Sequence, residues 1–146
     1  VKAKSVISGG IEKEFSLLFP EESKILAAPI TLKAYNLREI LIEKIRAILT
    51  RRGVKARDFI DVYKIIQFEN INIETLSNKI INKIQAMLRF EKYNLNLEEK
   101  QASGFIFNIA EEEKMLLAPL DKDFDDFLVK FRRFLHDLAM KFKPQN

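Results

Sequence analysis

The chain has 146 residues, of which 47% are hydrophobic and 32% are charged, so it is long enough for one compact domain with its own core. It contains no cysteine, which excludes disulfides and thiolate metal sites. No apolar run approaches the roughly 20 residues of a membrane-spanning helix, and the polar N-terminus does not resemble a signal peptide. We therefore expect a cytoplasmic protein without a membrane partner. The net charge of +4 is compatible with a nucleotide or RNA partner, but an ordinary Lys-rich surface also accounts for it.

Residues 1–36 differ in pattern from the rest of the chain. Three short segments of extended character, 3–7, 13–19 and 29–35, predict two or three strands. A Ser-Gly-Gly turn at 8–10 separates the first two, and the segment 20–23, which begins with proline, is expected to break the chain before the third. Such short strands cannot form a sheet that buries both faces, so they need partners from elsewhere.

From residue 36 onward the spacing of apolar residues is helical. The first predicted helix ends at Gly53, and further helices are expected at 56–68 and 74–90, with a mixed helical and extended pattern at 96–116. The last helix carries an apolar stripe that we assign to the core: Phe124, Phe127, Leu128, Phe131, Leu135, Leu138 and Phe142. The predicted fold class is α+β and mostly α, with two or three short N-terminal strands followed by a bundle of about four to five helices. The predicted domains are a strand region at 1–36 and a helical lobe at 37–146.

Charged residues flank the apolar faces of the first two predicted helices. Lys44 lies beside the apolar stripe of the first helix, with Arg51 close to the same line, and Asp58 lies beside that of the second. Asp61 is one turn beyond Asp58 on the outer side, and its spacing from Arg57 permits an ion pair. Because a very short loop joins the two helices, they are expected to fold back on each other and to bring Lys44 and Asp58 to one seam. Such a seam is either a cleft or a buried salt bridge that fixes the helix register.

Two segments of the sequence resemble a known family. Residues 37–51, LREILIEKIRAILTR, are similar to the segment that AbiEii/AbiGii-type nucleotidyltransferases carry after their catalytic sheet. Residues 55–63, KARDFIDVY, resemble the Arg-Asp-x-x-Asp element of that family. The predicted strand at 30–35 and the acidic run at 123–126 also fit, and the specific match covers about residues 35–66.

The resemblance implies a polymerase-β-like nucleotidyltransferase with a helical C-terminal region. It implies transfer of a nucleoside monophosphate from an NTP, with Mg²⁺, to an acceptor that is RNA, notably tRNA, in characterised relatives. Several relatives are toxins neutralised by a cognate antitoxin. Carried over by position, Lys44 contacts the triphosphate with Arg51 and Arg57 as further nucleotide-binding residues, and Asp58 and Asp61 are the catalytic acidic pair.

One motif of the resembled family is missing from the first 36 residues. The family places a Gly-Gly or Gly-Ser turn before an Asp-x-Asp pair on a strand, which holds the metals, whereas residues 1–36 contain no aspartate. We therefore expect this chain to correspond to the C-terminal portion of such an enzyme and to be inactive alone, with its metal ligands unassigned. The alternative is a non-catalytic helical module that binds RNA or protein and in which Lys44 and Asp58 have only a structural role.

Overall fold

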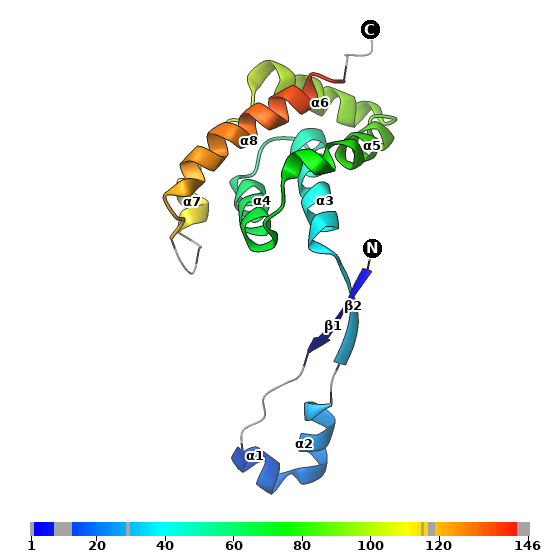
Figure 1. Ribbon diagram of the computed structural model, residues 1–146, viewed down its shortest axis with the longest axis vertical. Coiled ribbons are helices and arrows are strands. Elements are labelled where there is room, and N and C mark those ends of the chain that lie inside the picture. Colours follow the sequence, from blue (N-terminus) through cyan, green and yellow to red (C-terminus); the bar gives the residue numbers. More distant parts are fainter. Residues whose placement is uncertain (1, 8–12, 29, 115, 117–118, 143–146) are drawn as a thin grey trace. The chain divides into compact units, whose positions relative to one another are not determined.

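The computed structural model describes residues 2–7, 13–28, 30–114, 116 and 119–142, and the chain forms two compact units, residues 1–36 and 37–146 (Figure 1). Helices dominate the described residues, so the prediction of a mostly helical fold is confirmed. Within these residues, no helix has both the length and the apolar character needed to cross a membrane.

The first unit is built on a two-stranded antiparallel ribbon. Strand β1 (Lys2–Ile7) pairs with β2 (Ile30–Tyr35) along its full length, from Lys2 opposite Tyr35 to Ile7 opposite Ile30. Two of the predicted strands are therefore present. The predicted turn at 8–10 lies outside the described residues.

The prediction of a strand at 13–19 is wrong, because α1 (Lys13–Leu18) and α2 (Pro20–Ala27) lie between the two strands. The reason is the spacing of Phe15 and Phe19, which are four residues apart. Their ring centroids lie 5.2 Å apart, in the contact that a helix forms between residues i and i+4. Pro20 also starts a helix and does not break the chain. Proline suits the first helical turn, where its missing N–H has no partner to lose, and acidic residues follow it there.

The second unit begins with an antiparallel helical hairpin formed by α3 (Leu37–Thr50) and α4 (Ala56–Glu69). The short connection contains Gly53, whose φ of +66° lies in the left-handed region that glycine adopts without strain. Asn70 ends α4 in the left-handed conformation, with a φ of 48°. Helix α4 follows its predicted range closely, whereas α3 ends at Thr50 and thus earlier than the predicted end at Gly53.

The remaining helices of the second unit are a 3₁₀ turn at Ile73–Leu76, α5 (Ser77–Met87), α6 (Glu91–Ser103), the short α7 (Ala110–Glu113) and α8 (Asp123–Ala139). The predicted helix at 74–90 thus starts as a 3₁₀ turn and ends earlier than expected. Helix α6 is longer than the helical stretch seen in the sequence, and the apolar residues 105–107 form neither a strand nor a helix. The second unit contains six α-helices in its described residues, against the four to five predicted.

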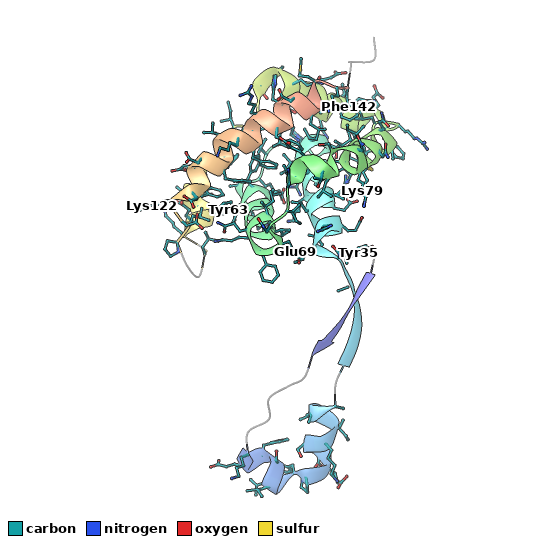
Figure 2. The ribbon with its side chains drawn as sticks, in the orientation of Figure 1. Tyr35, Tyr63, Glu69, Lys79, Lys122 and Phe142 are labelled. Atoms are coloured by element: carbon teal, nitrogen blue, oxygen red, sulfur yellow. The ribbon has the colours of Figure 1, made fainter. Side chains whose placement is uncertain are left out.

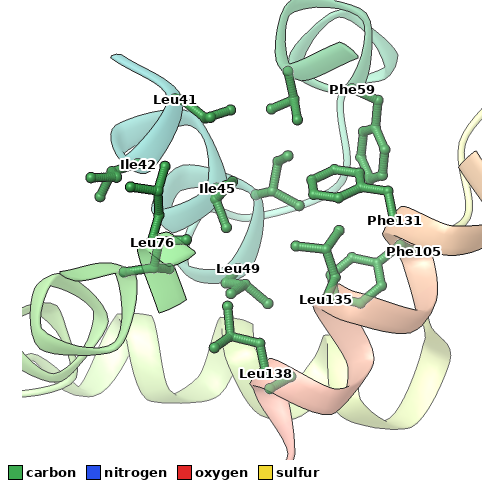
Figure 3. Packing of buried hydrophobic residues seen from close by; sticks show 14 of the residues in the cluster. Leu41, Ile42, Ile45, Leu49, Phe59, Leu76, Phe105, Phe131, Leu135 and Leu138 are labelled. Atoms are coloured by element: carbon green, nitrogen blue, oxygen red, sulfur yellow. The ribbon is translucent and has the colours of Figure 1, made fainter. Parts of the chain in front are cut away.

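Helix α3 is the centre of the second unit, because it contacts α4, α5, α6 and α8. Its residues Leu41, Ile45 and Leu49 are fully buried. Figure 3 shows them facing Phe59 of α4 and the apolar side chains of α8. The apolar stripe of α8 packs into this core, as the sequence predicts. Packing against these neighbouring helices therefore fixes the position of the α3 face that lies next to α4.

Candidate functional site

Four charged side chains meet where α3 packs against the start of α4, and we call them the charged seam: Lys44, Arg51, Asp58 and Asp61. Lys44 Nζ donates to Asp58 Oδ1 at 3.1 Å and to Asp61 Oδ2 at 2.5 Å. Arg51 Nη2 donates to the other carboxylate oxygen of Asp58. Asp58 therefore bridges two cations, and the predicted meeting of Lys44 with Asp58 is confirmed.

The antiparallel packing of α3 and α4 explains this arrangement. Lys44 and Arg51 are seven residues apart, which places them on one face of the helical path. Asp58 and Asp61 are one turn apart at the start of α4, on the side that faces α3. The apolar residues on either side are fixed in the core, so the four charged groups are held by two rigid helices.

Burial of the seam is uneven, and the unevenness has chemical consequences. The Asp58 side chain is only 7% exposed, whereas those of Lys44, Asp61 and Arg51 are 31%, 38% and 39% exposed. Asp58 is thus the buried base of the seam, and the two cations extend from it toward solvent. The ammonium and guanidinium groups have more N–H donors than these carboxylate contacts use, and Arg51 Nε is buried without a hydrogen-bond partner.

Arg57 is not part of this seam. Its side chain is exposed, and within the described residues it forms no ion pair with Asp61, which contacts Lys44. The ion pair that the spacing of Arg57 and Asp61 permits is therefore not formed among the described residues. Asp61 is also less peripheral than its place on the helical projection indicates, because the long Lys44 side chain reaches across to it.

Two residues of α6 that the sequence did not single out hold the end of α3. Asn96 Nδ2 donates to the Thr50 carbonyl oxygen at 2.9 Å, and Lys100 Nζ donates to the Arg51 carbonyl oxygen. Lys100 is only 3% exposed, and this burial lowers its pKa to about 8. The negative charge of Glu99 works to raise the pKa, whereas the positive charge of Arg51 lowers it further. These contacts fix the backbone from which the Arg51 side chain extends. The only sequence signal was a Lys in line with the buried face of a largely polar helix.

A second ion cluster, which we call the α3–α5 cluster, lies on another side of α3. Lys83 Nζ donates to Glu43 Oε1 at 2.6 Å and to Glu39 Oε2 at 3.2 Å, and Arg46 Nε donates to Glu43 Oε2 at 2.7 Å. Burial works to raise the pKa of Glu43, but the hydrogen bonds from Lys83 and Arg46 lower it overall. The hydrogen bond to Glu43 raises the pKa of Lys83 against the effect of burial.

The carboxylates of the charged seam do not form a metal site by themselves. Both oxygens of Asp58 and one oxygen of Asp61 accept hydrogen bonds from cations. Among the residues that the structure describes, no three His, Cys, Asp or Glu side chains gather closely enough to hold a metal ion. A magnesium ion prefers several oxygen ligands with few competing cations, so these residues do not fit it unaided.

Comparison with known families assigns the chain. The model of the family described as "Nucleotidyl transferase AbiEii toxin, Type IV TA system" matches residues 5–144. The chain belongs to the AbiEii family. No curated protein and no solved structure matches it.

The family match includes the charged seam. It extends over nearly the whole chain, so both units and the charged seam lie inside the AbiEii region. The resemblance noted in the sequence, centred on residues 35–66, is thereby confirmed at the level of the family. The seam in this AbiEii-family chain is a set of two cations and two carboxylates on the helical hairpin of α3 and α4.

Proposed function

We propose that the charged seam binds the triphosphate of an NTP, in a nucleotidyltransferase that transfers a nucleoside monophosphate to RNA, such as tRNA. In this proposal the protein acts as the toxin of a toxin–antitoxin pair and is countered by a cognate antitoxin. The observation that carries the proposal is that the buried Asp58 pairs with both Lys44 and Arg51. This shared carboxylate holds two partly exposed cations close together on the α3–α4 hairpin.

The chemistry of the transfer suits such a site. An acceptor hydroxyl oxygen attacks the α-phosphorus, pyrophosphate leaves, and negative charge collects on the departing phosphates. A Lys acts on such charge as a compact point charge, and an Arg can donate two hydrogen bonds side by side to phosphate oxygens. Because these groups are already positioned, little reorganisation is needed during the reaction.

The roles within the seam follow from its contacts. Lys44 and Arg51 contact the phosphates, while Asp58 and Asp61 hold the two cations in place and keep the site neutral before the nucleotide arrives. Asp58 and Asp61 are thus positioning residues in this proposal, although they occupy the positions of the family's acidic pair. Arg57 is assigned no phosphate contact, because it lies apart from the seam.

We propose that Mg²⁺ is held mainly by groups other than Asp58 and Asp61. The metal would neutralise phosphate charge and orient the triphosphate. Because residues 1–36 lack the expected Asp-x-Asp pair, we also propose that this chain by itself binds the nucleotide but does not transfer it.

A non-catalytic role remains the alternative, and the α3–α5 cluster is the observation that favours it. That cluster also combines two cations with two carboxylates between two helices, and ion pairs of this kind can link two helices without any ligand. In this alternative the protein is a helical module that binds RNA or protein.

The test is label transfer from an α-³²P-labelled NTP to tRNA, in the presence of Mg²⁺, by the protein that contains this chain together with the Asp-x-Asp portion that the proposal requires. Lys44→Ala is expected to lower the transfer rate by about 100-fold, which is the usual effect of removing a donor to developing charge. Lys83→Ala is the matched control, because it removes the central cation of the other cluster, and it is expected to leave the rate unchanged. Transfer that survives Lys44→Ala in a folded protein contradicts the assignment.

A further inference from the structure

A shallow hollow lies on the α3–α4 hairpin beside the charged seam. It has a volume of about 580 Å³ and is lined by Leu37 of α3 and by Lys64, Ile65, Gln67 and Phe68 of α4. A hollow of this volume is within the range of sites that hold small molecules. Phe68 is 81% exposed there, so a large aromatic ring is left in water on an otherwise well-packed hairpin.

The hollow and the charged seam lie on the same face of the hairpin. Leu37 precedes Lys44 by seven residues, and Phe68 follows Asp61 by seven, so each pair is in line along its helix. Seven residues correspond to about 10 Å along a helix axis. Because α3 and α4 are antiparallel, both displacements point the same way, and the hollow lies about two turns from the Lys44–Asp61 contact. An extended nucleotide separates its base from its terminal phosphates by a similar length.

The lining of the hollow offers the two kinds of contact that a nucleobase needs. Phe68 presents an exposed ring on which a base can stack, since every base has a π-face. Gln67 supplies an amide at the edge, and this amide is held in place because its Nε2 donates to the Tyr63 hydroxyl oxygen at 2.7 Å. The Lys64 ammonium lies 5.5 Å from the centre of the Tyr63 ring.

The neighbouring network keeps this wall of the hollow in position. Tyr63 is buried, and its hydroxyl donates to the Asp121 carboxylate just before α8. The other oxygen of that carboxylate accepts from Gln67 Nε2 at 3.4 Å and lies 4.0 Å from Lys64 Nζ. The polar groups at the hollow are therefore tied to the core of the helical unit.

We propose that this hollow binds the nucleobase of the same NTP whose triphosphate contacts Lys44 and Arg51, with the base stacked on Phe68 and its edge facing Gln67. The inference rests on the proposed function of the charged seam. It adds the residues that contact the base to those that contact the phosphates.

The test compares two kinds of ligand that share the phosphates, of which only one kind carries a base. The chain is titrated by calorimetry with each of the four NTPs and, separately, with inorganic tripolyphosphate, all in the presence of Mg²⁺. Phe68→Ser is expected to weaken the binding of the best-bound NTP by about 10-fold, because the stacking contact is lost, and to leave the binding of tripolyphosphate unchanged. Phe90→Ser is the matched control, because Phe90 is also exposed, at 58%, but lies outside the hollow, and it is expected to change neither.

The outcomes separate this inference from the function on which it rests. If the unaltered protein binds NTP no more tightly than tripolyphosphate, or if Phe68→Ser binds NTP as well as the unaltered protein does, the nucleobase site is contradicted and the phosphate site is retained. If Phe68→Ser leaves NTP binding unchanged and instead weakens the binding of tRNA, titrated in the same way, the hollow belongs to the acceptor and this inference is overturned. If neither NTP nor tripolyphosphate binds, the phosphate site fails and the nucleobase site fails with it.

Discussion

The two ion clusters on α3 make an instructive comparison, because they have the same charges and different surroundings. The charged seam and the α3–α5 cluster each combine two cations with two carboxylates and each link α3 to a neighbouring helix. In the seam one carboxylate, Asp58, is 7% exposed, whereas Glu39 and Glu43 of the other cluster are 25% and 45% exposed. Charge pairing alone therefore does not identify a site. The seam is set apart by its buried anion, which orients two cations, and by the hollow on the same face.

The largest expected effect of this difference is on stability. Asp58→Ala should lower the free energy of unfolding by about 3 kcal/mol, because it leaves Lys44 and Arg51 without the buried carboxylate that holds them. Glu43→Ala removes the matching carboxylate of the other cluster, which is half exposed, and should cost less than about 1 kcal/mol. Urea unfolding followed by circular dichroism measures both values. Equal losses for the two variants would show that the clusters do not differ in this respect.

The next effect concerns pH and the buried Lys100 that supports the end of α3. The unfolded chain keeps the Lys100 proton up to its ordinary pKa of 10.5, whereas the folded chain releases it near 8. The unfolded state thus binds more protons between these values, so stability should rise by about 2 kcal/mol from pH 7 to pH 9.5. Tyr63 offsets little of this rise, because its ordinary pKa of 10.0 and its folded-state pKa of about 12 both lie above pH 9.5.

The variant Lys100→Met should remove this rise in stability. Lys92→Met is the matched control, because Lys92 is an exposed lysine on the same helix, and the rise should persist in it. Urea unfolding at the two pH values measures the change. A rise that persists in Lys100→Met would show that another group causes it.

The smallest expected effect is that of losing the cation from either cluster. Lys44→Met and Lys83→Met should each cost about 1 kcal/mol or less, since both side chains are about one-third exposed and the carboxylates keep an arginine partner or contact with solvent. Thermal unfolding of the two variants measures this cost. A much larger loss in Lys44→Met alone would favour the buried-salt-bridge interpretation of the seam.

The sequence was sufficient to predict that Lys44 and Asp58 meet in the seam, because that contact depends on local geometry. A loop of a few residues forces α3 and α4 to be antiparallel neighbours, so the helical projection alone shows that Lys44 and Asp58 share a face. Arg51 lies on the same line of the helical projection as Lys44. Its contact with Asp58 was not predicted, because it depends on the path of the chain between the end of α3 and Gly53.

The features that the sequence did not predict depend on contacts between distant segments. Lys100 and Arg51 are 49 residues apart, and no local periodicity relates them. The hollow beside Phe68 likewise needs the start of α3 to meet the end of α4. The wrong strand prediction at 13–19 has another cause, because short apolar runs fit both a strand and a helix, and here the Phe15–Phe19 contact belongs to a helix.

We propose that the charged seam, and not the α3–α5 cluster, binds the phosphates of a nucleotide. The most direct measurement is the calorimetric dissociation constant of Mg²⁺-tripolyphosphate for the unaltered protein, Lys44→Met and Lys83→Met. We predict that Lys44→Met weakens binding by about 10-fold or more, as expected for the loss of a charge-assisted contact, while Lys83→Met binds as the unaltered protein does. Equal affinities for the two variants would contradict the claim.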